Sequence, residues 1–368
     1  MTEPSEGGAF DSIDHALMAR ALALAEKGLW TTEPNPRVGC IVADGERIVG
    51  SGWHERAGGP HAEIVALREA GDAAAGATVY VTLEPCSHHG RTPPCADALI
   101  AAGVARVVCA VRDPHPVAGS GLERLRAAGI EVQSGLMEAE ARALNPGFLS
   151  RHERGRPWLR AKLAGSLDGR TYGPDGESRW ITGRAARRDG HRWRARAGAI
   201  LTGIDTVLAD DPSLDVRLDG HRATPPVVVV DSRGRLPANA RVLATGARVL
   251  QATPPGAADP PPGCERVDAP DDGAGRVDLA ALARALAERE FNEVHVEAGA
   301  RLTGALLVAG LVDELLLYQA PCLIGADGGP LVRLPGVEKL ADRLQFEVLD
   351  RREIGPDTRL RLRPVGGR

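Results

Sequence analysis

The sequence has few aromatic residues, no long apolar run and no long tract of like charge. Aromatic residues are only 3% of its 368 residues, so the 43% hydrophobic content comes mainly from Ala, Val and Leu, which suits parallel sheets covered by helices. No run of 18 apolar residues could span a bilayer, and residues 1–9 lack the basic and apolar parts of a signal peptide. We therefore expect a cytosolic protein without a membrane partner.

Charge and length further restrict the expected partners and the number of domains. The formal net charge is -4, and acidic and basic residues are interspersed, so no tract could follow a phosphate backbone and nucleic acid is not an expected partner. A length of 368 residues exceeds the usual size of one hydrophobic core and predicts two domains. We expect them over residues 9–145 and 157–366, with Leu144 to Pro157 as a short basic connector.

Most of the six cysteines are not expected to bind metal. Cys40 and Cys109 lie inside apolar strand-like runs, which is typical of small core residues. Cys264 in a Pro/Gly-rich loop and Cys322 after a strand have no His or Cys at ligand spacing. The candidate metal ligands are the remaining two, Cys86 and Cys95.

The N-terminal half predicts an α/β unit. Apolar periodicity predicts a helix from Asp11 to a C-cap at Gly28, followed by a hairpin of residues 38–43 and 47–53 that turns at Asp44-Gly45. The further elements expected are a helix over 61–70 closed by Gly71, a strand over 78–83, a helix over 95–102 closed by Gly103 and a strand over 106–111.

Metal-ligand residues stand at two of these helix starts. His61 opens one helix, Cys86 follows a strand, and Cys95 opens the next helix after Pro94. The free N–H groups and partial positive charge of a helix start stabilise thiolates. One imidazole and two thiolates suit Zn²⁺ and leave its fourth tetrahedral position open for water. We therefore predict a catalytic zinc site.

Glu63 is the predicted proton carrier of this site. It lies two residues from His61, so both side chains can reach one site only beyond the end of the helix. There Glu63 can take a proton from the water that zinc activates and pass it to a departing amine, as in the H-x-E zinc deaminases. The triplet alone is more often a solvated helix start, but its combination with two cysteines is specific.

The loop between the two cysteines is longer than the P-C-x-x-C of the general signature. It reads Pro85-Cys86-Ser87-His88-His89-Gly90-Arg91-Thr92-Pro93-Pro94-Cys95. His88, His89 and Arg91 are donors that could bind an anionic group of a substrate, or they could simply be solvated. Either histidine could also replace His61 as a ligand, at the cost of strain in the loop.

The C-terminal half predicts a largely parallel sheet, because strands and helices alternate. Two segments could bind a ligand: residues 166–182 after the first strand, and 296–299, where a strand ends at a glycine that opens a helix. No G-x-G-x-x-G motif is present, so a Rossmann dehydrogenase is disfavoured. The expected strands are 158–164, 197–202, 226–231, 248–251, 293–297 and 314–318, and the expected helices are 182–196, 278–290 and 302–308.

Four motifs of the N-terminal half occur together in one known family. They are Pro34-Asn35-Pro36-Arg37-Val38-Gly39, Gly52-Trp53-His54-Glu55-Arg56-Ala57-Gly58, His61-Ala62-Glu63 and the segment from Glu84 to Cys95. They resemble the deaminase half of the bifunctional deaminase/reductase family of riboflavin biosynthesis. The resemblance implies a cytidine-deaminase-like fold and hydrolysis of the C2 amino group of a diaminopyrimidinone ribosylamine phosphate. It also implies zinc binding by His61, Cys86 and Cys95, proton transfer by Glu63, and substrate contacts from Asn35 and His54.

The C-terminal half resembles the reductase half of the same family. The matching segments are 166–170, 176–182, 194–196, 204–212, 217, 231–232, 296–299, 304–307 and 310–314. The resemblance implies a dihydrofolate-reductase-like domain that uses NADPH to reduce the ribosyl group to ribityl. The implied NADPH contacts are Ala164, Trp180, Thr206, Asp210, Ser232, Gly299, Ala300 and Arg301, and the implied substrate contacts are Ser178, Arg194, Leu214, Arg217 and Glu297.

Physical chemistry adds roles to some of these side chains. Arg194 and Arg217 could each grip a sugar phosphate through two hydrogen bonds, although both could also be solvated arginines. Lys162 and Asp210 are the candidates for helping proton transfer as hydride arrives from the cofactor. Ser232 and Arg233, just after a strand, are candidates for binding a 2′-phosphate.

We therefore predict a bifunctional enzyme that acts on a small phosphorylated pyrimidine. A tRNA or DNA base deaminase shares the H-x-E and Pro-Cys pattern, but the acidic balance, the long cysteine loop and the second domain disfavour it. A third hypothesis is a structural zinc protein whose site holds a fourth protein ligand. We expect a homodimer, with the apolar hairpin-like stretch 344–362 as a plausible part of its interface.

Overall fold

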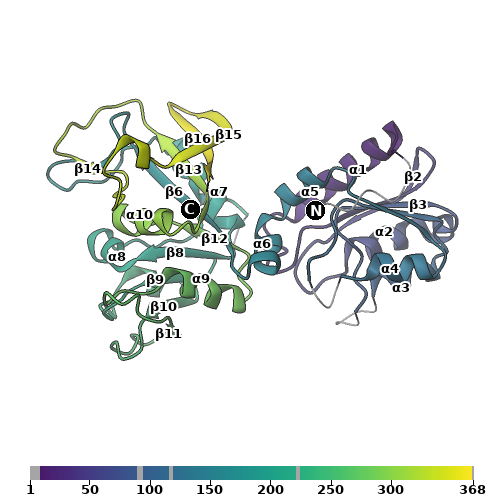
Figure 1. Cartoon of the computed structure of the whole chain (residues 1–368), viewed down its shortest axis with the longest axis horizontal. Helices are drawn as coiled ribbons and strands as arrows, with labels where there is room; N and C mark the ends of the chain where they lie inside the picture. The colour runs from purple at the N-terminus through teal and green to yellow at the C-terminus, as the bar shows by residue number, and fades with distance from the viewer. Residues whose placement is uncertain (1–8, 89–93, 116–118, 221–223, 367–368) are drawn as a thin grey trace. The chain divides into compact units, whose positions relative to one another are not determined.

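The computed structural model describes residues 9–88, 94–115, 119–220 and 224–366. The chain divides into two compact units, one ending at Arg154 and one beginning at Gly155 (Figure 1). The segment expected as a connector is therefore largely part of the first unit, where it forms α6 (Pro146–Arg154). Proline suits the first position of a helix, where its missing N–H is not needed, so Asn145-Pro146-Gly147 starts a helix rather than a loop.

The first unit is a sheet covered by helices on both faces. Among its described residues the sheet has five strands in the order β2-β1-β3-β4-β5, of which β3, β4 and β5 are parallel. One face packs on α2, α3 and α4, and the other on α1, α5 and α6. The elements are α1 (Ser12–Ala25), β1 (Gly39–Asp44), β2 (Arg47–Trp53), α2 (Ala62–Ala70), β3 (Thr78–Val81), α3 (Cys95–Ala101), β4 (Arg106–Cys109), α4 (Gly121–Ala127), β5 (Glu131–Ser134) and α5 (Glu138–Leu144).

Glycines at the helix ends partly follow the prediction. Gly71 and Gly103 have φ angles of 54° and 68° just beyond α2 and α3, as expected. The prediction for Gly28 is wrong, because α1 ends at Ala25 and Gly28 closes a 3₁₀ turn without a positive φ. A Cβ at Gly28 would lie 2.9 Å from the backbone oxygen of His54, so close packing requires this glycine.

The second unit contains the predicted, largely parallel sheet. In the part of the chain that the structure describes, its order is β11-β10-β9-β8-β12-β6-β13-β16-β15, and only the β13-β16 and β16-β15 pairs are antiparallel. The hairpin expected over 344–362 forms β15 and β16 at one edge; the homodimer remains a prediction. The strands are β6 (Trp158–Gly165), β8 (Ala199–Gly203), β9 (Val227–Val230), β10 (Val249–Thr253), β11 (Cys264–Asp268), β12 (Glu293–Val296), β13 (Val312–Gln319), β15 (Gln345–Ile354) and β16 (Asp357–Val365).

The two faces of this sheet differ in character. The face that packs on α9 (Leu279–Glu288) and α10 (Ala300–Val308) is an apolar core, which includes Val294 and Val296 of β12. The opposite face, under α7 (Arg184–Arg196), carries Glu293 and His295 of β12, because successive residues of a strand point to opposite sides. A short helix, α8 (Ile204–Asp210), follows β8, and β7 (Arg170–Tyr172) pairs with β14 (Gly329–Pro330).

A layer of buried ion pairs lies on this face, and Arg196 of α7 joins it at 2.9 Å from Glu293. Arg160 is 1% exposed and lies 2.9 Å from Glu293 and 3.2 Å from Glu314, which also accepts a hydrogen bond of 2.7 Å from Arg361. The indole ring of Trp193 lies 4.6 Å from the guanidinium carbon of Arg160. Loss of one partner from such a layer would leave a buried charge without compensation.

Asp189 connects the middle of α7 to the C-terminal strands. Its carboxylate accepts hydrogen bonds from the Tyr318 hydroxyl on β13 at 2.6 Å and from Arg359 on β16 at 2.8 Å. All three side chains are buried. The position of α7 on the sheet therefore depends on the last strand of the chain.

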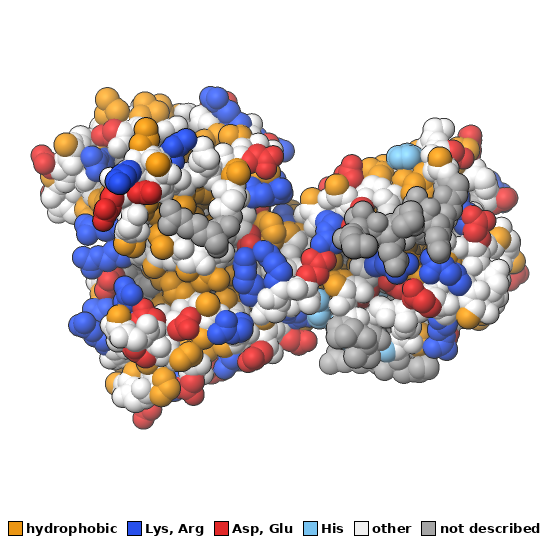
Figure 2. Space-filling view, viewed as in Figure 1, with side chains coloured by type: hydrophobic (Ala, Val, Ile, Leu, Met, Phe, Trp, Pro, Cys, Tyr) orange, Lys and Arg blue, Asp and Glu red, His pale blue; other side chains and the backbone are white. Residues whose placement is uncertain are grey.

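Surface and core follow most of the sequence-based expectations. Cys40 and Cys109 are buried core residues, whereas Cys264 begins β11 instead of lying in the expected loop. No helix within the described ranges is both long and apolar enough to cross a membrane. On the face drawn in Figure 2, basic and acidic side chains are interspersed on each unit, as the sequence indicates.

Candidate active sites

His61, Cys86 and Cys95 converge at one point of the first unit. His61 is the N-cap of α2, Cys86 follows β3, and Cys95 is the first residue of α3. His61 Nδ1 lies 3.2 Å from Cys95 Sγ and 3.5 Å from Cys86 Sγ. The three potential ligand atoms lie within 4.8 Å of one another, and within the described residues the group comprises these three side chains. This donor set fits tetrahedral zinc with one position left open.

Hydrogen bonds prepare Cys86 to bind a cation. The backbone N–H of Cys95 donates to Cys86 Sγ over 3.4 Å. Hydrogen bonds from the Cys95 thiol and from His61 lower the pKa of the Cys86 thiol, because they stabilise its thiolate. Because zinc binds thiolates and a neutral imidazole, metal binding at these residues would release protons.

Glu63 lies in the first turn of α2 beside this group. Its side chain is 3% exposed, and burial raises the pKa of its carboxyl group above the ordinary value. A carboxyl group with a raised pKa can hold and release a proton near neutral pH. The geometry therefore suits the predicted proton carrier.

Asn35 and His54 meet next to the metal ligands. The Nδ1 atom of His54 lies 2.9 Å from the Pro60 carbonyl, so it carries the ring proton and leaves Nε2 to accept from Asn35 Nδ2 at 3.0 Å. Burial lowers the pKa of His54, which favours this neutral form. The His54 and His61 rings are 5.6 Å apart. Both predicted substrate contacts thus border the candidate zinc site.

The loop between the cysteines is only partly described. The ring of His88 stacks on His115 with centroids 6.2 Å apart, and His88 does not belong to the ligand group. The structure therefore favours His61 over His88 as the ligand. The other two candidates, His89 and Arg91, lie outside the described residues.

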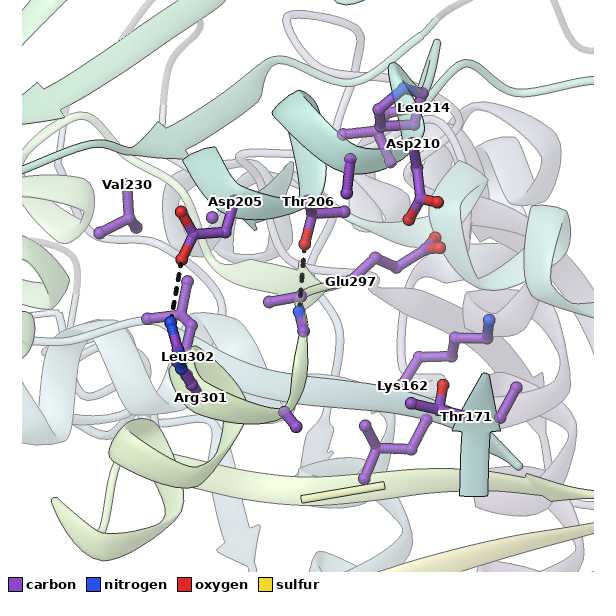
Figure 3. Close-up of a pocket in the computed structure, with 18 of the residues that line it drawn as sticks. Lys162, Thr171, Asp205, Thr206, Asp210, Leu214, Val230, Glu297, Arg301 and Leu302 are labelled. Atoms are coloured by element: carbon purple, nitrogen blue, oxygen red, sulfur yellow. Dashed lines mark hydrogen bonds and ion pairs between the residues drawn. The ribbon is translucent and has the colours of Figure 1, made fainter. Parts of the chain in front are cut away.

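A cleft of about 2380 Å³ opens in the second unit. It lies over the carboxyl ends of β6, β8, β9 and β12, where α/β sheets commonly bind ligands (Figure 3). The residues named from the sequence for the reductase half all line it, and they are Lys162, Ala164, Ser178, Trp180, Arg194, Thr206, Asp210, Leu214, Arg217, Ser232, Arg233, Glu297, Gly299, Ala300 and Arg301.

Arg194 does not present the free guanidinium that a phosphate grip requires. Its Nε and Nη2 atoms bind the two carboxylate oxygens of Glu297, and its Nη1 donates to the backbone oxygen of Asp215 at 2.8 Å. Burial alone would raise the pKa of Glu297, but Arg194 holds it well below its usual value. Arg194 therefore keeps Glu297 ionised and oriented, and its expected contact with the substrate stays a prediction.

Lys162 and Asp210 enter the same cavity from different elements. Figure 3 shows the Lys162 side chain, from β6, extending into the cavity on the side of Glu297 and Asp210. Burial lowers the pKa of Lys162, and the nearby charge of Glu297 offsets part of this effect. Asp210, at the end of α8, accepts a hydrogen bond of 3.1 Å from Ser178. A lysine with a lowered pKa is suited to donating a proton.

The start of α10 offers backbone N–H groups to the cleft. Gly299 is its N-cap, and the Gly299 N–H donates to Thr206 Oγ1 at 3.2 Å (Figure 3). The following N–H groups of a helix start are suited to a cofactor phosphate. Ser232 Oγ accepts from the Val277 N–H at 3.0 Å, which holds it at the edge of the cleft.

Sequence patterns did not single out two charged or polar residues near the cleft, Asp205 and His295. Asp205 lies 2.9 Å from Arg235 and 4.0 Å from Arg301. Its position next to Thr206, a predicted NADPH contact, could have indicated that it lies at the cleft. His295 is fully buried, with Nε2 3.4 Å from Glu297 Oε1. The alternation along β12 puts His295 on the same face as Glu297, so strand periodicity could have indicated it.

Fold and sites together define a zinc deaminase unit joined to a reductase unit. A family model described as the cytidine and deoxycytidylate deaminase zinc-binding region matches residues 11–111, and the RibD C-terminal domain matches residues 157–360. The chain belongs to the RibD family and is a bifunctional deaminase/reductase of riboflavin biosynthesis. This confirms the predicted family and fold class, and a base deaminase or a structural zinc protein would not explain the second match.

Relatives match over nearly the whole chain. The riboflavin biosynthesis protein RibD of Escherichia coli is 51% identical, with 95% of this chain and 99% of that protein covered. The RibD structure of Acinetobacter baumannii is 44% identical, covers 96% of this chain and 99% of its own, and has a TM-score of 0.89. A deaminase/reductase structure from Thermotoga maritima is 34% identical with the same coverage and a TM-score of 0.86.

Proposed function

We propose that the chain hydrolyses the 2-amino group of 2,5-diamino-6-(ribosylamino)-4(3H)-pyrimidinone 5′-phosphate and then reduces the ribosyl group to ribityl with NADPH. Deamination is assigned to residues 9–145 and reduction to residues 157–366. The Thermotoga maritima relative is named for both reactions, as a diaminohydroxyphosphoribosylaminopyrimidine deaminase and a 5-amino-6-(5-phosphoribosylamino)uracil reductase. The observation that carries the proposal is the presence of a zinc-type ligand group beside buried Glu63 in one unit and a lysine-lined cleft in the other.

The first reaction uses a small number of side chains. Zinc held by His61, Cys86 and Cys95 would supply a water acidified to a pKa of about 7 as the nucleophile. Glu63 takes a proton from that nucleophile and delivers it to the amine, which leaves as ammonia. Asn35 and His54, joined by their 3.0 Å contact, orient the pyrimidine ring. The raised pKa of Glu63 suits both halves of this proton transfer.

The second reaction adds a hydride to sugar carbon C1 and a proton to the ring oxygen, which becomes a hydroxyl group. NADPH supplies the hydride. Lys162 donates the proton, with Asp210 as the second group in reach of the sugar, and ionised Glu297 accepts hydrogen bonds from sugar hydroxyls. The remaining substrate contacts are Ser178, Arg194, Leu214 and Arg217.

NADPH binds along the other part of the cleft in this proposal. The start of α10, with Gly299, Ala300 and Arg301, receives its phosphates. In support of this, the Gly299 N–H bonds to Thr206 Oγ1 and so holds this helix start at the cleft. Ala164, Trp180, Thr206 and Asp210 make further contacts, and the 2′-phosphate lies at Ser232 and Arg233. We place both reactions in the cytosol, because all six cysteines are unpaired.

One assay tests the whole proposal. The protein is incubated with the diaminopyrimidinone phosphate and NADPH, while ammonia release and cofactor absorbance are followed together. We expect one ammonia and one oxidised NADPH for each substrate molecule consumed. Glu63→Ala should stop ammonia release and leave NADPH oxidation on the deaminated substrate intact. Unchanged ammonia release in this variant would contradict the assignment of the first site.

A further inference from the structure

Asn145, between α5 and α6, is hydrogen-bonded to the loop that carries Asn35. Its side-chain oxygen accepts a hydrogen bond of 2.8 Å from the backbone N–H of Arg37, and its side-chain nitrogen donates one of 2.8 Å to the Arg37 carbonyl. Asn145 and Arg37 are both buried. One amide side chain therefore satisfies both backbone polar groups of Arg37, as a neighbouring strand would.

The position of Asn145 is fixed by the helices on either side of it. Its N–H donates to the Arg142 carbonyl at the end of α5, and its carbonyl accepts from the Leu149 N–H in α6. The guanidinium of Arg37 in turn donates to the Leu144 carbonyl at 2.9 Å, at the C-terminal end of α5, where the helix dipole favours a cation. Two segments 108 residues apart therefore hold each other in place.

Arg37 lies close in the chain to both predicted substrate contacts of the deaminase site. Asn35 is two residues before it, and the carbonyl of the next residue, Val38, accepts from the His54 N–H at 2.9 Å. The side chains of Asn35 and His54 are joined by their 3.0 Å contact. A shift of the Arg37 backbone would therefore move these side chains relative to the zinc ligands. Displacements of about 1 Å in groups that position a substrate can cost about 10²-fold in rate.

Only a side chain with an acceptor and a donor side by side can make both bonds to Arg37. Aspartate has the shape of asparagine but would place a carboxylate oxygen against the Arg37 carbonyl, at the position from which the amide donates. Alanine would leave a buried N–H and a buried carbonyl without these partners. Either substitution at Asn145 should therefore let the Arg37 backbone leave its present position.

We propose that Asn145 is a positioning residue of the deaminase, which holds the Arg37 backbone so that Asn35 and His54 meet the substrate in the right orientation. This inference rests on the proposed function. The family match that includes the metal ligands and Glu63 ends at residue 111, so Asn145 lies outside it. The deaminase active site thus depends on the start of α6 as well as on the zinc-binding segment.

A double-mutant cycle on the full-length, zinc-loaded chain tests this role. Asn145→Asp should lower kcat/KM for ammonia release about 10- to 100-fold, while zinc content and NADPH oxidation on the deaminated substrate stay the same. Asn35→Ala removes the side chain through which Asn145 acts, so adding Asn145→Asp to it should cause little further loss. Equal losses with and without the Asn35 side chain would overturn the inference.

Two further variants separate positioning from general effects. Ala143→Asp adds the same charge at an exposed position of α5, two residues away, and should deaminate as the wild type does. An equal loss in Ala143→Asp would trace the effect to charge and overturn the inference. Asn145→Ala takes the place of Asn145→Asp in the cycle if the aspartate variant does not fold. Loss of zinc from both Asn145 variants would show that Asn145 supports the whole unit instead of Asn35.

The contact between Asn35 and His54 provides a readout that needs no substrate. In nitrogen NMR spectra of the zinc-loaded protein, the His54 Nε2 resonance should move in Asn145→Asp in the same direction as in Asn35→Ala, because both variants weaken the same hydrogen bond. His54→Gln identifies the resonance, and an unmoved signal in Asn145→Asp would contradict the positioning role. If the signal moves but the protein never releases ammonia from the diaminopyrimidinone phosphate, the proposed function fails while the role of Asn145 stands.

Discussion

The two active sites differ in how far apart their residues lie in the sequence. The candidate zinc site needs only the segment from His61 to Cys95, where two helix starts and one strand end place all its ligands. The predicted residues of the reductase cleft extend from Lys162 to Arg301 and come from strand ends, from α7, α8 and the start of α10, and from the loops between them. A site of the first kind is specified by local structure, whereas one of the second kind exists only after the whole sheet has formed.

The largest expected effect concerns the zinc ligands. Cys86→Ala should reduce zinc content from about one ion per chain to nearly none and abolish ammonia release, because two protein ligands rarely hold zinc. NADPH oxidation on the deaminated substrate should persist. His88→Ala is the matched control, since His88 lies outside the ligand group and zinc should be retained. Metal analysis of the purified variants checks both, and zinc retained in Cys86→Ala would argue against the site.

Substitution of Glu63 removes the proton carrier of the zinc site but not the metal, so it tests whether the two active sites work independently. Glu63→Gln should lower the deamination rate by about 10²–10⁴-fold, the usual contribution of general acid–base catalysis, while zinc content stays the same. Glu69→Gln, at the other end of α2, should deaminate normally. Initial rates of ammonia release provide the measurement. A parallel loss of reductase activity in Glu63→Gln would show that the two sites are not independent.

The buried ion pairs of the second unit predict a stability effect confined to that unit. Glu314→Gln leaves Arg160 and Arg361 without their shared carboxylate and should cost about 3–5 kcal/mol at pH 7. Burial would raise the pKa of Glu314, but Arg160 and Arg361 lower it to about 2, against 4.5 when unpaired. Its contribution is therefore complete above pH 4.5 and is lost as the pH falls toward 2.

Denaturant unfolding at pH 7 and pH 3 checks this effect. The difference between wild type and Glu314→Gln should shrink at pH 3. Glu347→Gln on exposed β15 should change the free energy of unfolding by less than about 1 kcal/mol, because its pair with Arg363 is exposed. Equal effects of the two substitutions would contradict the importance of the buried layer.

The smallest expected effect is a pH dependence in one reaction only. Burial lowers the pKa of Lys162 from 10.5, and a proton donor must be protonated. The reductase kcat should therefore fall with rising pH, beginning below the range of an ordinary lysine. Lys162→Arg should be slower but lack this alkaline fall, because a guanidinium stays protonated. Deamination should show the same pH profile in both proteins, and a retained fall in Lys162→Arg would exclude Lys162 as its origin.

The features that the sequence predicts correctly are those set by residues close together in the chain. Helix starts at His61 and Cys95, strand runs such as Val227 to Val230 and the glycine before α10 are all readable from neighbouring residues. The features that the sequence did not indicate depend on partners far away in the chain. The guanidinium of Arg194 is taken up by Glu297, 103 residues later, and Gly28 is needed because of the backbone at His54. Strand alternation could place His295 on the face of Glu297, but its contact with that carboxylate follows only from the folded structure.

Asp189 also bears on the order in which the chain can complete its reductase site. The helix that carries Arg194 is held to the sheet through Tyr318 and Arg359, which are synthesised more than 120 residues after Asp189. Chains fold largely from the N-terminus during synthesis, so the zinc site can form while the reductase is still being translated. The reductase cleft must wait for the last strand to leave the ribosome. A chain cut short before β16 would therefore retain the ligands of one reaction and lose the framework of the other.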